Sequence, residues 1–158
     1  PRVDPGPGAL LTTMSPDELI RQLNADLDGL PDVIGVNNHM GSKMTAESDR
    51  MNQIFSVLKQ RNLFFIDSRT TAETQSSRSA RLFKVPFAQR DVFLDHVQQP
   101  EYIRAQMDKL IRYAESHGEA IGIGHPHTVT FEVLRGLLPK LKGKIDWVPA
   151  SRVVHVGG

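Results

Sequence analysis

The chain has 158 residues, enough for one domain with a sizeable core, and 39% of them are hydrophobic and 23% charged. Its net charge of +1, without a run of interleaved basic and aromatic residues, excludes a dedicated nucleic-acid surface. No stretch approaches the roughly 18 apolar residues of a membrane span. Cysteine is absent, which excludes disulfides and thiol catalysis.

The first part of the chain predicts an irregular lead-in followed by a helix. Residues 1–14 are rich in proline and glycine, which favour turns. Ser15 then offers an N-cap, a proline occupies the first helical position, and Glu18 stands where a capping box needs it. Apolar residues follow at helical spacing, so we expect a helix that ends at Gly29.

Two short apolar runs in the next part of the chain each end in polar residues. The first, residues 33–36, leads into Asn37, Asn38 and His39, and a Gly-Ser turn then precedes a helix predicted from near Thr45 to residue 61.

The second apolar run, residues 63–66, leads directly into Asp67 and Arg69, before a polar helix expected over residues 72–81. A carboxylate and a guanidinium just after a buried strand are costly unless they are paired or solvated in a cleft. The alternative is that Asp67 caps the next helix and Arg69 lies on the surface.

The segment 85–95 mixes apolar and charged residues. Adjacent residues in a strand face opposite ways, so Arg90 and Asp91 cannot pair with each other, and we expect one of them to line a cleft. We expect His96 on the surface. The following helix should run from Pro100 to a glycine cap at Gly118.

The segment 120–127 carries the strongest chemical signal in the sequence. An apolar run with glycines at alternate positions predicts a buried parallel strand, and it ends in His125 and His127. Pro126 fixes the backbone between them, so both rings should project to the same side. This geometry suits metal ligands or acid–base catalysts. The alternative is that one or both histidines bond to loop backbone.

The remaining residues predict one more helix and a short strand. Thr130 can cap a helix that Pro139 bends or ends. Residues 145–148 have the apolar character of a final strand, and His155 belongs to a tail that we expect to be frayed or loosely packed.

The alternation of short strands and longer helices predicts an α/β fold built from parallel βα units. The carboxyl ends of parallel strands meet at one edge of a sheet, where polar side chains can form a cleft. The residues expected there are His39, Asp67, Arg69, His125 and His127. The pattern by itself indicates a hydrolytic or metal site.

Four segments resemble, in chain order, the successive motifs of the divergent polysaccharide deacetylase family, and the resemblance covers essentially the whole chain. The segments are Asn37–Ser42, Phe65–Thr71, Arg90–Asp95 and Gly122–His127. The resemblance implies a distorted (β/α) barrel like that of the NodB-type carbohydrate deacetylases. It also implies a periplasmic or secreted, metal-dependent hydrolase that removes N-acetyl groups from cell-envelope carbohydrate.

In such enzymes a divalent metal polarises an acetamide carbonyl and activates water, while a histidine acts as general acid. The resemblance implies zinc, with cobalt or manganese as alternatives. Carried over by motif, His39 is a metal ligand, His125 is either a ligand or the acid, and His127 is a further ligand or a support for them. Asp67 and Arg69 would join His125 as catalytic residues by orienting a histidine. The substrate-binding residues would be Asn38, Ser42, Arg90 and Asp91.

Two features depart from the family pattern. Lys43 stands where better-known deacetylases have a second histidine, and the sequence has no Asp-Asp pair. We therefore expect the chain to be the C-terminal portion of the domain, without the N-terminal strands. Roughly five strands are too few to close a barrel that needs about seven or eight, which predicts an exposed edge and homodimerisation or strand exchange. The alternative functions are a non-catalytic envelope protein that binds glycan or serves as a scaffold, and another barrel hydrolase.

Overall fold

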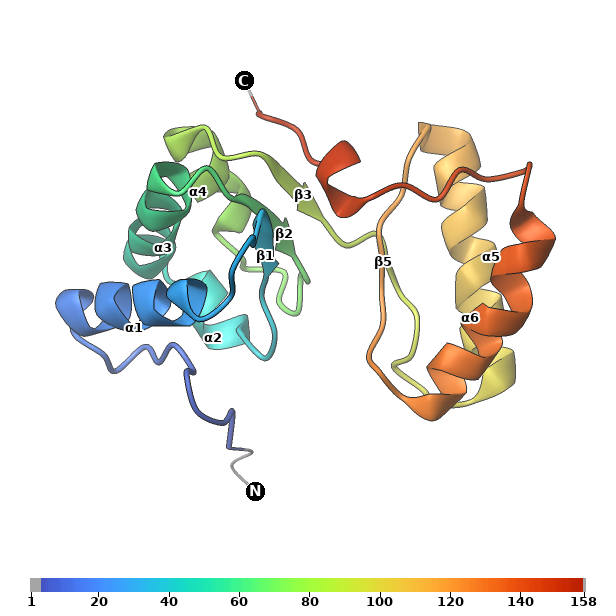
Figure 1. The fold of residues 1–158 in the computed structure, drawn as a ribbon, viewed down its shortest axis with the longest axis horizontal. Helices are drawn as coiled ribbons and strands as arrows, with labels where there is room; N and C mark the ends of the chain where they lie inside the picture. Colours follow the sequence, from blue (N-terminus) through green and yellow to red (C-terminus); the bar gives the residue numbers. More distant parts are fainter. Residues whose placement is uncertain (1–3, 158) are drawn as a thin grey trace. The chain divides into compact units, whose positions relative to one another are not determined.

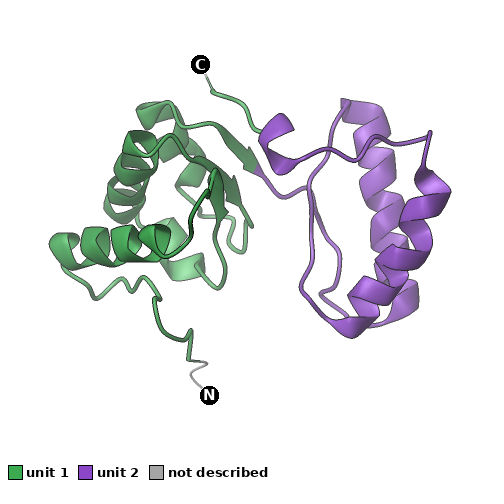
Figure 2. Ribbon diagram, viewed as in Figure 1, with its two compact units in different colours: residues 1–88, 154–158 green, residues 89–153 purple. Residues whose placement is uncertain are grey.

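The structure, a computed structural model, describes residues 4–157 of the chain. Over these residues it contains six α-helices and short strands with parallel pairing, which confirms the α/β class. The chain divides into two compact units, residues 1–88 with 154–158 and residues 89–153 (Figures 1 and 2). Each unit is described by itself below.

Unit 1 begins with helix α1, Pro16–Asp28, at the predicted place. The expected capping box is present, because the main-chain N–H of Ser15 donates to Oε2 of Glu18 (2.7 Å) and that of Glu18 donates to Oγ of Ser15 (3.3 Å). Gly29 is the C-cap. Residues 4–14 form neither helix nor strand, and the first three residues of the expected lead-in lie outside the described residues.

The sheet of unit 1 has the order β1-β2-β3, with β1 at Gly35–Asn37, β2 at Phe64–Asp67 and β3 at Phe87–Gln89. Strands β1 and β2 are parallel. Gly35 lies opposite Phe64, and a Cβ added there would come within 2.3 Å of the Phe64 ring. Glycine at this position therefore leaves room for the ring of Phe64.

Three helices follow β1 and β2: α2 (Ser42–Ala46), α3 (Ser48–Gln60) and α4 (Ser76–Phe83). The prediction of a single helix from near Thr45 was wrong. The backbone is extended at Glu47, so the segment forms two helices, α2 and α3. The carbonyl of Thr45 accepts a hydrogen bond from the main-chain N–H of Gln75 (2.7 Å), so it is used between segments instead of within a helix. This contact also precedes α4, which begins four residues later than predicted.

Figure 1 shows α1, α3 and α4 gathered beside the strands of unit 1, where they enclose the main hydrophobic core. The rings of Phe55 on α3 and Phe65 on β2 lie 5.0 Å apart at the centre of this core. The apolar stripes that predicted the helices are thus the faces that pack on the sheet.

The outer edge of β3 is covered by the end of the chain. The main-chain groups of Phe87 and His155 exchange two hydrogen bonds of 2.9 and 3.0 Å in an antiparallel bridge. The expectation of a frayed tail at His155 was wrong, because the N–H and C=O groups of an edge strand bind a neighbouring backbone when one is available.

Strand β1 is the other edge of this sheet among the described residues. Leu30 and Ile34 lie just before it and are each 61% exposed. We propose that two copies of the chain associate through this edge, and we predict a dimer in light scattering that Ile34→Lys shifts toward monomer, because a lysine at an edge opposes pairing. A monomer at all concentrations would contradict the proposal.

Unit 2 contains the parallel pair β4 (Val92–Phe93) and β5 (Gly122–Ile123), with helices α5 (Pro100–His117) and α6 (Thr128–Leu141) packed against each other. A Cβ at Gly122 would stand 2.7 Å from Cδ2 of Leu110. One of the alternate glycines is therefore explained by the close packing of α5 on β5.

Two boundaries in unit 2 differ from prediction. Helix α6 begins at Thr128, with His127 in the N-cap position, and continues past Pro139. The strand expected over residues 145–148 was wrong: the segment is irregular and precedes a 3₁₀ turn at Ala150–Arg152. Its Trp147 is 49% exposed, so the apolar side chains there do not form the buried face that stabilises a strand.

Closure of the strands into a barrel stays a proposal.

Helices that could cross a membrane are not found in residues 4–157, since none is both long and apolar enough.

Candidate functional site

Asp95 and His125 meet just beyond the carboxyl ends of β4 and β5. The register pairs Phe93 with Ile123, and the main-chain N–H of Leu94 donates to the carbonyl of Ile123 (2.8 Å). Two residues further along each strand come Asp95 and His125, so the parallel register brings them side by side on the same face.

The carboxylate of Asp95 binds His125 twice. Its Oδ1 lies 3.0 Å from Nδ1 of His125, and its Oδ2 accepts the main-chain N–H of His125 at 2.5 Å. Asp95 is only 3% exposed, whereas the His125 side chain is 30% exposed. An ionised carboxylate only accepts hydrogen bonds, so we assign the ring hydrogen to Nδ1, and Nε2 points away from Asp95.

Thr130 completes the surroundings of this carboxylate. Its Oγ1 donates to Oδ2 of Asp95 at 2.9 Å. Burial by itself raises the pKa of Asp95, but the hydrogen bonds from His125 and Thr130 outweigh it and hold the pKa of this carboxyl below its usual value. Asp95 is therefore an anion at neutral pH.

This lowered pKa predicts a pH-dependent contribution of Asp95 to stability. A carboxyl with a lower pKa in the folded state stabilises the fold above its unfolded pKa of about 3.9, and the contribution is lost as pH falls through the folded pKa. With chelator present, Asp95→Asn should lower the free energy of unfolding by roughly 1.5–3 kcal/mol at pH 7. Urea unfolding at pH 7, 4 and 3 should show this gap narrowing, and a constant gap would contradict the prediction.

Aromatic and cationic side chains surround the His125 ring. The Phe93 ring lies 5.4 Å from it, and the guanidinium carbon of Arg90 lies 5.2 Å from the Phe93 centroid. His96 is exposed, as expected, with its ring 6.3 Å from that of Phe93. Phe93 thus lies close to both the His125 ring and the guanidinium of Arg90.

Asp91 is engaged at the opposite end of β4 from Asp95. Its Oδ2 accepts the main-chain N–H of Ile121 at 2.8 Å, and its own N–H donates to the Ile121 carbonyl at 2.9 Å. This pair of bonds holds the start of β5 beside the start of β4.

Asp67 in unit 1 is completely buried. Its Oδ1 accepts the main-chain N–H of Arg69 (2.8 Å), and its Oδ2 accepts the hydroxyl of Thr74 (2.7 Å). Asp67 therefore closes the loop that follows β2. Arg69 is exposed and has a positive φ of 50° within that loop.

The loops after β1 and β2 are bonded to each other. Ser68 donates its N–H to Oδ1 of Asn38 (2.7 Å) and its hydroxyl to the Asn38 carbonyl (2.5 Å), while Ser42 donates to Thr70 (2.9 Å). His39 comes directly after Asn38 and is exposed. The position of His39 is thus set by a loop that Ser68 holds in place.

A sequence model of the family described as "Divergent polysaccharide deacetylase" matches residues 1–154. The chain belongs to the divergent polysaccharide deacetylase family. This confirms the family that the four motifs indicated.

Two curated proteins are similar to this chain over most of its length. It is 39% identical over 142 residues to "Uncharacterized protein YibQ" of Escherichia coli K12, covering 90% of this chain and 44% of that protein. It is 36% identical over 141 residues to an "Uncharacterized protein" of Haemophilus influenzae, covering 89% of this chain and 50% of that one. The chain therefore spans about half the length of these relatives.

The fold is similar to a solved structure, described as the "Crystal structure of uncharacterized protein ATU2773 from Agrobacterium tumefaciens C58". The TM-score is 0.92 at 26% sequence identity, over 96% of this chain and 62% of that one.

The donors present fit the metal that a deacetylase family implies. Single ligand atoms of Asp95, His125 and His127 all lie within 4.8 Å of one another. One carboxylate oxygen and two imidazole nitrogens are donors that zinc, cobalt and manganese accept. Asp95 is also the carboxylate partner that a ligating or catalytic histidine ordinarily has.

The structure brings together only part of the predicted set. His125 and His127 share one cluster with Asp95 in unit 2, and Arg90 lies over the Phe93 ring that is next to His125. Asp91 binds Ile121 in the same unit. The other predicted residues belong to unit 1 and are Asn38, His39, Ser42, Asp67 and Arg69.

Sequence reasoning assigned no role to Asp95 and saw Thr130 only as a helix cap. One signal was available for Asp95. It directly follows the apolar run Val92–Leu94, in the same way that Asp67 directly follows the apolar run 63–66. Thr130 offered no comparable signal. A threonine at a helix start is common, and its bond to Asp95 spans 35 positions of sequence.

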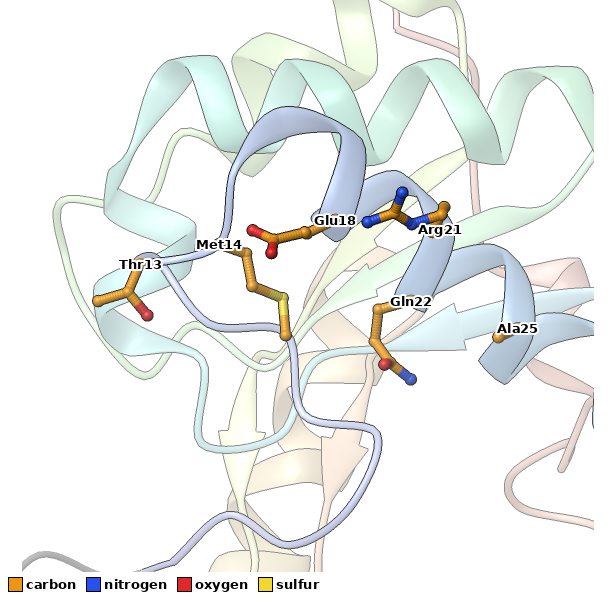
Figure 3. Close-up of a pocket in the computed structure, with 6 residues that line it drawn as sticks. All are labelled: Thr13, Met14, Glu18, Arg21, Gln22 and Ala25. Carbon is orange, nitrogen blue, oxygen red and sulfur yellow. The ribbon is translucent and has the colours of Figure 1, made fainter.

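A pocket lies elsewhere, along α1 in unit 1 (Figure 3). Its lining residues are Thr13, Met14, Glu18, Arg21, Gln22 and Ala25. Glu18 is already engaged in the capping box, and the pocket contains none of the predicted site residues, so we assign it no function.

Proposed function

We propose that this protein removes N-acetyl groups from cell-envelope carbohydrate by metal-dependent hydrolysis of the acetamide. The observation that supports the proposal is the buried Asp95 paired with His125, beside His127. A carboxylate that holds a partly exposed histidine is the arrangement a proton-transferring residue needs. The family assignment supports the substrate class.

His125 is the proton donor in this proposal. Hydrolysis breaks the bond between the acetyl carbon and nitrogen, water supplies the new oxygen of acetate, and the departing nitrogen must gain a proton. Nε2 of His125 delivers that proton, while Asp95 keeps its bond to Nδ1 and stabilises the charged form of the ring.

His127 would be a ligand of the metal, with Asp95 as a neighbouring donor, and we propose that the metal is zinc, with cobalt or manganese as alternatives. A ligand role for His39 is proposed separately, on the family resemblance. When bound, such an ion supplies polarisation of the carbonyl and a water of lowered pKa. The role of this chain is to present imidazole nitrogens and to hold them in place through main-chain contacts. The N–H of His127 donates to the His125 carbonyl at 2.8 Å, which fixes the short segment between the two rings.

Substrate contacts are proposed for Arg90, Asn38, Ser42 and Asp91. Arg90 is the best supported, because it lies over the same Phe93 ring that packs on His125. Orientation of a histidine is proposed for Asp67 and Arg69. The periplasm or the extracellular space is the proposed location, on the family resemblance.

A second candidate is a non-catalytic glycan-binding or scaffolding protein of the cell envelope. Two observations favour it: Lys43 replaces a metal-ligating histidine, and the sequence has no Asp-Asp pair to supply another ligand and a base. A lysine ammonium carries no lone pair for a metal.

The two functions are separated by metal content and acetate release, measured on protein purified without chelator and then supplied with zinc, cobalt or manganese. The hydrolase predicts stoichiometric metal that His127→Ala removes, and acetate release from N-acetylated oligosaccharide. Loss of metal in His39→Ala would support the ligand role proposed for His39. His125→Ala should keep the metal and lose acetate release; loss of metal there would make His125 a ligand. Neither metal nor acetate, with glycan still bound, would establish the binding function.

A further inference from the structure

Thr130 is hydrogen-bonded to the carboxylate of Asp95, which is in turn hydrogen-bonded to His125. It is the third residue of α6, only 3% exposed, and its hydroxyl donates to Oδ2 of Asp95 at 2.9 Å. The main-chain N–H of His125 donates to the same oxygen. With Oδ2 occupied by these two donors, Oδ1 is the oxygen that faces Nδ1 of His125.

We propose that Thr130 is a positioning residue that sets the rotation of the Asp95 carboxylate and, through it, the ring of His125. The consequence for catalysis rests on the proposed role of His125 as proton donor. The consequence for the ring itself does not depend on that role. Without the Thr130 hydroxyl, the carboxylate can turn about its Cβ–Cγ bond and weaken its bond to Nδ1.

Helix α6 gives Thr130 a rigid base from which to act. The N–H of Phe131 donates to the carbonyl of His127 (3.0 Å), so the first turn of α6 is tied to the segment that carries both histidines. This hydrogen bond therefore fixes the position of Thr130 relative to the segment that carries His125, and both residues contact the same carboxylate of Asp95. Such outer carboxylate partners matter for function because they fix the tautomer and orientation of a histidine.

Gly124 leaves room for this arrangement. A Cβ at Gly124 would lie 3.2 Å from Oδ2 of Asp95 and 3.4 Å from Cγ2 of Thr130. A glycine at position 124 is thus explained by the closeness of the Asp95 carboxylate. The methyl group of Thr130 lies on another side of the same space.

The test compares Thr130→Val, which keeps the shape and removes the donor, with Thr130→Ser, which keeps the donor. Thr128→Val, at an exposed threonine two residues earlier in the same helix, is the matched control. The first measurement is by NMR on the full chain with chelator: the exchange with water of the Nδ1 hydrogen of His125, identified by its loss in His125→Ala. The second is kcat and KM for acetate release.

We expect Nδ1–H exchange to be faster by roughly tenfold or more in Thr130→Val, and unchanged in Thr130→Ser and Thr128→Val. We expect kcat to fall about 10–100-fold in Thr130→Val, with KM retained and with rescue by serine. Unchanged exchange in Thr130→Val would overturn the proposal. Absence of acetate release in the unmodified protein would overturn the hydrolase function, while the exchange measurement would still decide the role of Thr130.

Gly124→Ala provides a second variant if Thr130→Val does not fold. It deletes no buried group, but its Cβ would lie 3.2 Å from Oδ2 of Asp95, closer than an ordinary van der Waals contact, so the carboxylate would have to shift. Gly124→Ala should also accelerate the exchange of the Nδ1 hydrogen of His125. Normal exchange in the folded variant would contradict the proposal that the position of the Asp95 carboxylate controls the His125 ring.

Discussion

His125→Ala is expected to lower acetate release by about 10²–10⁴-fold, the contribution typical of a positioned general acid. The physical reason is that the amine cannot leave without a proton, and Nε2 of His125 is the proposed source. Asp95→Asn should cause a large decrease as well, because an amide can donate to Nδ1 and thereby favour the wrong tautomer. Both are measured as kcat on N-acetylated oligosaccharide with metal supplied.

His96→Ala is the matched control for this prediction. His96 is adjacent to Asp95 in sequence and contacts the same Phe93 ring, but it is exposed. Its removal should leave kcat within a few fold of the unmodified protein. An equal loss of activity in His96→Ala and His125→Ala would contradict the assignment of the acid to His125.

Asp67→Ala is expected to lower the free energy of unfolding by about 2–3 kcal/mol. Asp67 is completely buried and accepts hydrogen bonds from the N–H of Arg69 and the hydroxyl of Thr74, and both bonds would be lost. Urea unfolding followed by circular dichroism measures the change. Glu73→Ala, at an exposed residue in the same loop, should change stability by no more than about 0.5 kcal/mol.

This experiment also tests the catalytic role proposed for Asp67 from the sequence. A loss of stability with kcat retained in the folded fraction would make Asp67 a structural residue of the loop after β2. Unchanged stability together with loss of kcat would support the catalytic role instead.

Several local features were predictable because neighbouring residues determine them. The capping box of Ser15 and Glu18, the end of α1 at Gly29 and the glycine cap of α5 at Gly118 depend on contacts within one turn of helix. The prediction of a strand at residues 145–148 was wrong because a strand depends on pairing with a distant segment, which local sequence does not determine.

The sequence by itself determined the family and the α/β class, and it predicted a site at His125 and His127, since these follow from local patterns and from ordered motifs. Only the tertiary structure decided the partners of His125. Asp95 lies 30 positions away in sequence and meets His125 because β4 and β5 pair in one particular register. Thr130 joins them because the first turn of α6 places its hydroxyl against the same buried carboxylate, and that placement results from packing between segments.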